Sequence, residues 1–148
     1  MLFVFYLNTG KANFSVGYFQ MKPSFIEEME EIVHKDRGLK IQYHSLLPKG
    51  SVKDKRRFRL SNLLTLSGQL RYLSLFIDVV KQKTIKMNFN NNEEKLRYWA
   101  TLYNSGMNLS SEEVKQQQSV RQFPYFLKNY NYSEISVEFY DKIETMGW

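Results

Sequence analysis

Cysteine is absent from this chain of 148 residues, so disulfide bonds and cysteine-ligated metals are excluded. Histidine is scarce, because His34 and His44 are the only two, and neither has the neighbouring carboxylates that a metal site needs. The seven glycines are scattered and form no phosphate-binding loop. The sequence therefore predicts no metal site and no cofactor, and both histidines are expected at the surface or in local hydrogen bonds.

Long apolar runs are also missing, since no stretch approaches the ~18 residues that a membrane-spanning helix requires. The apolar start, residues 1–7, has no preceding basic residue and no small-residue cleavage site, so it is not typical of a signal peptide. We expect it to be a buried segment of a domain that is truncated at its N-terminus. A cell-envelope or periplasmic location is expected only if the chain belongs to a longer exported protein.

Hydrophobic residues make up 43% of the chain, which fits one folded domain over residues 1–148. The aromatic share of 16% suits a dense core and also a sugar-binding cleft. The net charge of +6 favours polyanionic partners such as nucleic acid or an anionic cell wall. Residues 49–59 alone carry +5, and we expect them to form a solvated loop and first helical turn. Their charged residues are Lys49, Lys53, Asp54, Lys55, Arg56, Arg57 and Arg59.

The spacing of apolar residues predicts an all-α fold of five or six helices, with no strand pattern long enough for a sheet. The first clear helix starts at Pro23, where Ser24 and Glu27 have capping-box spacing, and ends near residue 36. Its expected apolar stripe is Phe25, Ile26, Met29, Ile32 and Val33, opposite a polar face of Glu27, Glu28, Glu30 and Glu31. Residues 38–53 are expected to be a connection, packed or functional because it is long.

A long helical stretch is expected over about residues 54–84, where Gly68 marks a break or a close helix crossing. Its expected apolar stripe is Phe58, Leu63, Leu66, Leu70, Leu73, Ile77 and Val80, widened by Leu64, Leu75 and Phe76. A helix from near Asn92 should end at Gly106, and Ser110 with Glu113 should cap a short helix to about residue 118. Residues 119–132 are expected to be irregular. Ser133 should cap a last helix that turns Ile135, Phe139, Ile143 and Met146 to the core.

Two short segments carry the residues best suited to bind a ligand. Residues 15–23 read Ser-Val-Gly-Tyr-Phe-Gln-Met-Lys-Pro, in which Gly17 permits a sharp turn and Gln20 offers both a donor and an acceptor. Residues 99–106 read Trp-Ala-Thr-Leu-Tyr-Asn-Ser-Gly, which places Tyr103 and Asn104 at a helix end. Taken alone, each segment is an ordinary turn or helix end.

Together and in this order, the two segments resemble the Gly-Leu-Met-Gln and Ala-Xaa-Tyr-Asn-Xaa-Gly motifs of bacterial lytic transglycosylases, a branch of the lysozyme-like family. The resemblance implies a small all-helical lysozyme-like domain that acts on the peptidoglycan glycan, N-acetylmuramic acid alternating with N-acetylglucosamine. It implies non-hydrolytic cleavage that leaves a 1,6-anhydromuramoyl end. It also implies that Gln20, Tyr103 and Asn104, with Gly17 in the turn, contact substrate. Phe19 replaces the usual methionine, and the two motifs lie further apart than is usual.

The catalytic glutamate of that family, which stands roughly a dozen residues before the glycine motif, has no counterpart here. Counting back from Gly17 leads to residues 1–6, none of which is acidic, and the first acid in the chain is Glu27. Glycosidic cleavage needs an acid whose pKa burial has raised, whereas Glu27 and Glu28 are expected on an exposed helix face. We therefore assign no catalytic residue and expect the chain to be inactive or incomplete as an enzyme, truncation being favoured over a degenerate paralogue.

Two alternatives to a peptidoglycan partner stay open. The basic residues 49–59 could make this a helical module that binds nucleic acid, although no stacking series or helix-turn-helix pattern accompanies them. The chain could also be a helical domain that binds other proteins. Peptidoglycan strands are the favoured partner, nucleic acid is less favoured, and the sequence leaves the oligomeric state open.

Overall fold

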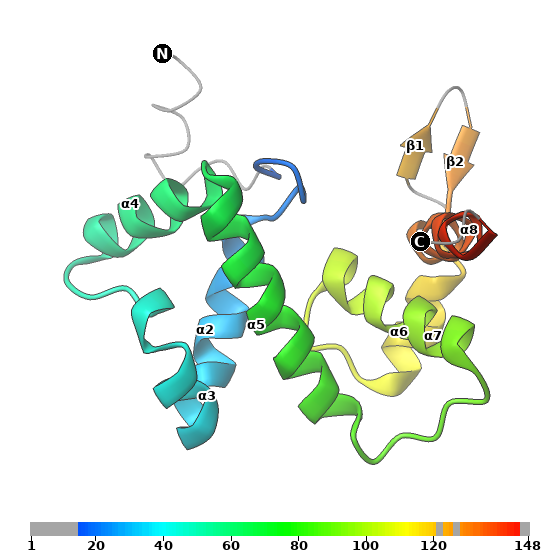
Figure 1. Cartoon of the computed structure of the whole chain (residues 1–148), viewed down its shortest axis with the longest axis horizontal. Helices are drawn as coiled ribbons and strands as arrows, with labels where there is room; N and C mark the ends of the chain where they lie inside the picture. The colour runs from blue at the N-terminus through cyan, green and yellow to red at the C-terminus, as the bar shows by residue number, and fades with distance from the viewer. Residues whose placement is uncertain (1–14, 121–122, 126–127, 146–148) are drawn as a thin grey trace. The chain divides into compact units, whose positions relative to one another are not determined.

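The computed structural model describes residues 15–120, 123–125 and 128–145 (Figure 1). Backbone contacts divide the chain into two compact units, Met1–Thr84 and Ile85–Trp148, and each is described by itself. The prediction of one domain over residues 1–148 stays a prediction, because contacts within each unit do not show whether the two fold together. The predicted buried segment at residues 1–7 lies outside the described residues.

The described residues of the first unit are mostly helical. The helices are α2 (Pro23–Lys35), α3 (Arg37–Gln42), the short 3-10 helix η1 (His44–Leu46), α4 (Val52–Leu63) and α5 (Leu66–Thr84). The second unit contains α6 (Asn92–Ser105), α7 (Ser111–Gln118) and α8 (Tyr132–Thr145), with a hairpin of two three-residue strands, β1 (Phe123–Tyr125) and β2 (Lys128–Tyr130). The all-α prediction is confirmed. The hairpin departs from the prediction, because residues 119–132 were expected to be irregular, and the described residues form seven α-helices where five or six were expected.

Helix ends test the capping predictions directly. Ser110 and Glu113 form the predicted capping box at α7, and Gly106 ends α6 with a φ of 116°. The box predicted at Ser24 is wrong, because α2 begins at Pro23 and the residue before it, Lys22, makes no side-chain cap hydrogen bond. A capping box that was not predicted, between Ser51 and Asp54, starts α4.

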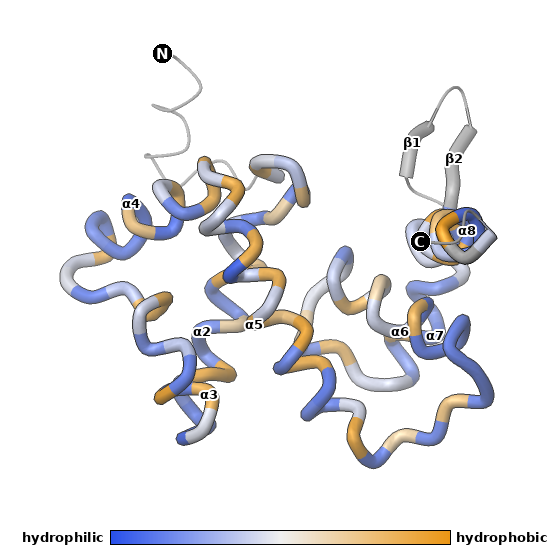
Figure 2. Tube along the Cα trace, viewed as in Figure 1, coloured by the Kyte–Doolittle hydropathy of each residue, from blue (hydrophilic) through white to orange (hydrophobic). Residues whose placement is uncertain are grey.

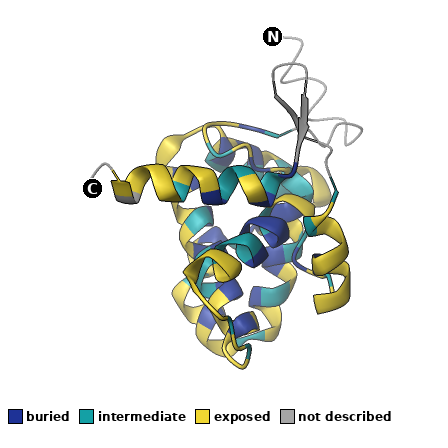
Figure 3. Ribbon diagram, turned by 90° about the vertical axis from the view of Figure 1, so that its right-hand side faces the viewer, coloured by how far each residue is buried: buried dark blue, intermediate teal, exposed yellow. Residues whose placement is uncertain are grey.

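The last helix, α8, starts two residues earlier than a cap at Ser133 predicts. Its cap is Asn131 rather than Ser133, since Asn131 Oδ1 accepts from the Ser133 amide at 2.9 Å and from its hydroxyl at 2.7 Å. Its buried face also differs from the prediction. Phe139 and Ile143 are exposed, whereas Val137 is 4% exposed, and Met146 lies outside the described residues. Figure 3 colours most of α8 as exposed or intermediate. The core side of α8 is therefore rotated from the side that its largest apolar residues suggested.

The expected connection at residues 38–53 is in fact largely helical, because α3 and η1 lie within it. Asp36 caps α3 through its side chain, which accepts from the Leu39 amide at 2.8 Å. Tyr43, at the end of α3, donates its hydroxyl to Asp78 of α5 at 2.6 Å. The bond from Tyr43 to Asp78 holds the segment against α5, so its length reflects packed structure.

The break predicted at Gly68 lies at residues 64–65, between α4 and α5, whose axes differ by 102°. Gly68 marks the close crossing instead, since a Cβ there would lie 2.2 Å from the Asn62 carbonyl oxygen. Thr65 caps the new helix by accepting from the Gly68 amide at 3.1 Å. No single helix among the described residues is long and apolar enough to cross a membrane; α4 and α5 pass that test only together, across this bend.

The core of the first unit gathers side chains from all its longer helices. Those that are fully or nearly fully buried include Ile26, Met29, Val33, Leu46, Leu63, Tyr72, Leu75 and Val80. The near-heptad stripe predicted for residues 58–80 is wrong in part, because Leu66 and Leu70 are exposed while Gln69 and Tyr72 are buried. The bend explains the error, since it starts a new helix whose apolar positions (Figure 2) follow their own phase.

Candidate functional site

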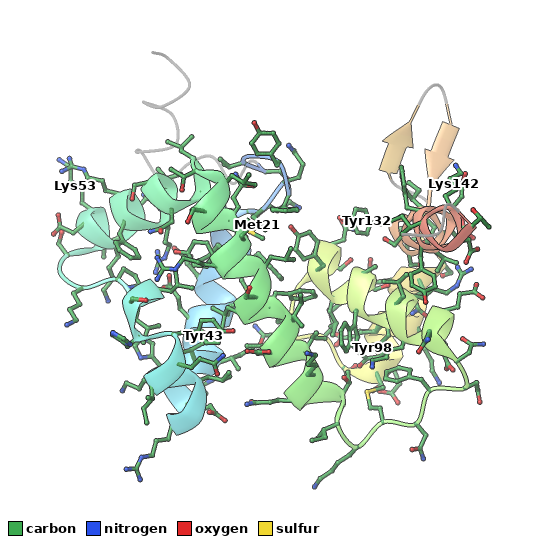
Figure 4. The ribbon with its side chains drawn as sticks, viewed as in Figure 1. Met21, Tyr43, Lys53, Tyr98, Tyr132 and Lys142 are labelled. Carbon is green, nitrogen blue, oxygen red and sulfur yellow. The ribbon has the colours of Figure 1, made fainter. Side chains whose placement is uncertain are left out.

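The first motif forms a tight turn before α2. Val16 and Met21 pair through two backbone hydrogen bonds, of 2.9 and 3.1 Å, and both side chains are buried (Figure 4 labels Met21). Between them, the Gln20 amide donates to the Gly17 carbonyl at 3.2 Å. Gly17 has a φ of 76° and Gln20 a φ of 51°, so two of the four turn residues have left-handed backbones. We call residues 16–21 the motif turn.

Gln69 of α5 bonds to the backbone of the motif turn and is 1% exposed. Its Oε1 accepts from the Phe19 amide at 3.0 Å, and its Nε2 donates to the Leu63 carbonyl at 2.8 Å. A Cβ at Gly17 would lie 1.9 Å from Gln69 Nε2, so only glycine allows this approach. One buried amide therefore ties the turn to the end of α4. Sequence patterns missed it, because a lone glutamine in an apolar helix carries no signal.

Gln20 has a strained backbone, and its side-chain amide has hydrogen-bonding groups without a partner among the described residues. A positive φ is uncommon in a residue other than glycine, and such residues cluster at functional sites. Its Nε2 donates to the Gly17 carbonyl at 2.7 Å, which fixes the direction of the exposed amide. One N–H and the Oε1 oxygen have no partner in the described part of the chain. The turn thus presents a fixed donor and a fixed acceptor to solvent.

The second motif ends α6. The Gly106 amide donates to the Leu102 carbonyl at 3.0 Å, which stops the helix just after Tyr103 and Asn104. Tyr103 is half-buried, and burial raises the pKa of its phenol well above the ordinary range, with a smaller contribution from Tyr132 of α8 (labelled in Figure 4). Asn104 is exposed, and its side-chain amide has no hydrogen-bond partner among the residues that the structure describes.

The two motifs belong to different units. Gly17 and Gln20 lie in the first, and Tyr103 and Asn104 in the second. The structure gives each motif its local geometry: a strained turn that carries a free amide, and a helix end that carries a half-buried phenol beside a second free amide. Their joint role in substrate binding stays a prediction from the resemblance.

The acids of α2 are held by a cation. Glu30 is buried, not on the polar face where it was predicted, and Arg59 Nε and Nη2 donate to its two carboxylate oxygens at distances of 2.6 to 3.1 Å. Burial raises the pKa of Glu30, and Arg59 opposes that shift. Glu27 binds Arg59 Nη1 at 2.5 Å and is half-exposed. Neither Glu30, with both oxygens bonded to Arg59, nor the solvated Glu27 meets the requirement for a catalytic acid.

The basic stretch contains residues in two different environments. Arg59 forms ion pairs with Glu27 and Glu30, and its side chain is 11% exposed. The prediction of a solvated stretch is therefore wrong for this residue. Lys49, Lys53 and Arg57 are exposed, as predicted. Asp54 lies among them, and hydrogen bonds from Ser51, followed by the nearby Arg57 and Lys53, hold the pKa of its carboxyl below the ordinary value. Among the described residues, Lys49, Lys53 and Arg57 have no ion-pair partner.

Both histidines lie at the surface, as predicted, and His44 makes a local contact of 3.0 Å between its Nδ1 and the Ile41 carbonyl. Within the described ranges, no three His, Cys, Asp or Glu side chains group as metal ligands. No protein-family model, curated protein or solved structure matches the chain.

Proposed function

We propose that this chain binds the glycan of peptidoglycan, N-acetylmuramic acid alternating with N-acetylglucosamine, and does not cleave it. The observation that carries the proposal is the geometry of Gln20. Its backbone is left-handed, and its exposed amide has one donor and one acceptor without a partner among the described residues. Sugar hydroxyl and acetamido groups are themselves donors and acceptors, so a fixed amide is complementary to them. Tyr103 and Asn104 are proposed as further contacts, on the resemblance to lytic transglycosylases.

We propose no cleavage of the glycosidic bond because Glu27 and Glu30 do not meet the requirement for a catalytic acid. In the family that the motifs resemble, a buried carboxylic acid protonates the leaving oxygen. Burial raises the pKa of Glu30, but both of its carboxylate oxygens are bound to Arg59. A carboxylate whose two oxygens both accept hydrogen bonds from one arginine has no free oxygen to present to a leaving group. The proposal is therefore a glycan-binding protein of lysozyme-like ancestry.

Co-sedimentation with purified peptidoglycan sacculi tests the binding. The informative variant is Gln20→Gly, which removes the amide and suits the left-handed backbone, so the turn keeps its shape. Losing two hydrogen bonds to sugar should weaken binding roughly tenfold. Gln82→Ala is the matched control, since Gln82 is an exposed glutamine on a helix of the same unit. Equal binding by the two variants would contradict the proposal.

Mass spectrometry of the soluble fraction tests the absence of cleavage separately. We expect no 1,6-anhydromuropeptides above a buffer control. Clear release would show that another residue supplies the acid, and would refute the argument from Glu27 and Glu30 while leaving binding intact.

A second function, binding of nucleic acid, is favoured by one observation: Lys49, Lys53 and Arg57 are exposed without ion-pair partners in the described part of the chain. Phosphate contacts give affinity that falls steeply with salt. Fluorescence anisotropy with labelled DNA at rising salt would detect this, and the double variant Lys53→Gln, Arg57→Gln should lower the salt slope by about 2 if both contact phosphate. Absence of binding at low salt would exclude this function.

A further inference from the structure

Tyr18 stands out as an exposed ring on a fixed support. Its side chain is 81% exposed, yet two residues before it Val16 is 5% exposed and three residues after it Met21 is 1% exposed. Single exposed apolar residues are common, and exposure alone needs no explanation. Tyr18, however, lies at the tip of a turn whose backbone is bonded at both ends and in the middle.

The backbone around Tyr18 is fixed by contacts on both sides. Gly17 before it accepts two hydrogen bonds from Gln20, one from the backbone and one from the side chain. The amide of Phe19 after it donates to the buried Gln69, which in turn donates to Leu63. A side chain carried on a fixed backbone loses little conformational entropy when it binds a ligand, and tyrosine has few torsions to restrict. The turn is therefore preorganised to present one aromatic ring.

Gln20 lies two residues away in the same turn and offers hydrogen bonds to solvent. An aromatic ring and an amide on one turn match the two kinds of surface that a pyranose has, an apolar face of C–H groups and an edge of hydroxyl and acetamido groups. The resemblance to lytic transglycosylases implied a role for Gln20 and none for Tyr18.

We propose that Tyr18 is a stacking platform for an N-acetylhexosamine ring of the bound glycan, and that Gln69 is the positioning residue that fixes the platform beside Gln20. This inference rests on the proposed function, because it names the contact by which the same turn takes its sugar. Gln69 acts through the turn backbone and touches no substrate.

Isothermal titration calorimetry with the N-acetylglucosamine trimer tests the platform in the intact chain. Tyr18→Ala should weaken binding roughly tenfold, and Tyr18→Phe, which keeps the ring, should stay within about twofold of wild type. Ile41→Ala is the control, since Ile41 is a 68% exposed apolar residue of the same unit outside the turn. Because Tyr18 and Ile41 are exposed, none of these variants removes a core contact.

The positioning role has its own readout, a double-mutant cycle between Tyr18→Ala and Gln69→Ala on the trimer affinity. If Gln69 acts by placing the ring, the two losses are not additive, and Gln69→Ala weakens the Tyr18→Ala variant far less than it weakens wild type. Additive losses would contradict the positioning role. Unchanged affinity of Tyr18→Ala would overturn the platform while the proposed function stands, whereas a wild-type chain that binds neither trimer nor sacculi would overturn both.

Discussion

Replacing Gly17 by alanine tests the architecture of the motif turn, because the consequences can be worked out atom by atom. The new Cβ would lie 1.9 Å from Nε2, 2.3 Å from Cδ and 2.5 Å from Oε1 of Gln69. The Gln69 amide must therefore leave its place, and its bonds to Phe19 and Leu63 are lost at a buried position. Two lost hydrogen bonds remove about 2–3 kcal/mol. The φ of 76° adds about 1 kcal/mol for any residue with a Cβ. The total is about 3–4 kcal/mol.

Urea denaturation, monitored by circular dichroism, measures this loss in the free energy of unfolding. In a Gln69→Ala background the clash is absent, so Gly17→Ala should cost only about 1 kcal/mol, the backbone term. Gly38→Ala is the matched control, because Gly38 lies in α3 and its nearest neighbour, Asp36 Oδ1, would be 3.3 Å from the new Cβ. We expect it to change stability by less than about 1 kcal/mol. An equal cost of Gly17→Ala in both backgrounds would refute the clamp by Gln69.

Three further predictions concern the first unit and are checked by the same denaturation measurement. Arg59→Met leaves the Glu30 carboxylate buried without its cation and should destabilise by about 3–5 kcal/mol at neutral pH. Because burial raises the pKa of Glu30 above its ordinary value of 4.5, the loss should shrink below pH 4.5 and grow as pH rises through the folded-state pKa; a loss independent of pH would contradict this. Tyr72→Phe removes a buried hydroxyl that has no partner among the described residues and should cost less than about 0.5 kcal/mol; a loss above about 1 kcal/mol would reveal a bond to that hydroxyl. Gly68→Ala places a Cβ against the Asn62 carbonyl and should destabilise by more than about 2 kcal/mol, whereas a neutral effect would show that the crossing of α4 and α5 can widen.

Local chemistry was the part of the fold that the sequence predicted well. Gly106 and the pair Ser110 with Glu113 determine helix ends through their own backbone or side-chain bonds, and Pro23 favours a helix start because its ring fixes φ. The structure has all three ends where they were expected. Such bonds involve residues three or four positions apart, so the sequence alone contains the whole interaction.

Tertiary context explains what could not be predicted. Glu30 carries a charge that patterning assigns to solvent, and only the distant Arg59 makes its burial tolerable. Leu66 and Leu70 continue an apolar period, but a 102° bend between α4 and α5 turns other residues of the new helix inward. Spacing along one segment cannot reveal a partner 29 positions away or the phase of a helix that starts after a sharp corner.

The candidate site divides in the same way. Gly17 and Gln20 were identified from their residue types, and the structure adds the left-handed backbone of both and the free amide. Gln69 was missed, because a buried glutamine is recognised only from the groups it bonds to. Tyr18 was not singled out either, since its significance depends on the fixed backbone beneath it.

The most direct test of glycan binding at the motif turn is an NMR titration of the isotope-labelled chain with the N-acetylglucosamine trimer. The chemical shifts of the amide groups are recorded as the sugar is added. The account predicts that the largest changes in the first unit fall on residues 16–21 and on the Gln20 side-chain amide, with little change along α4. Shifts centred on Lys53 and Arg57, or none at saturating sugar, would contradict it.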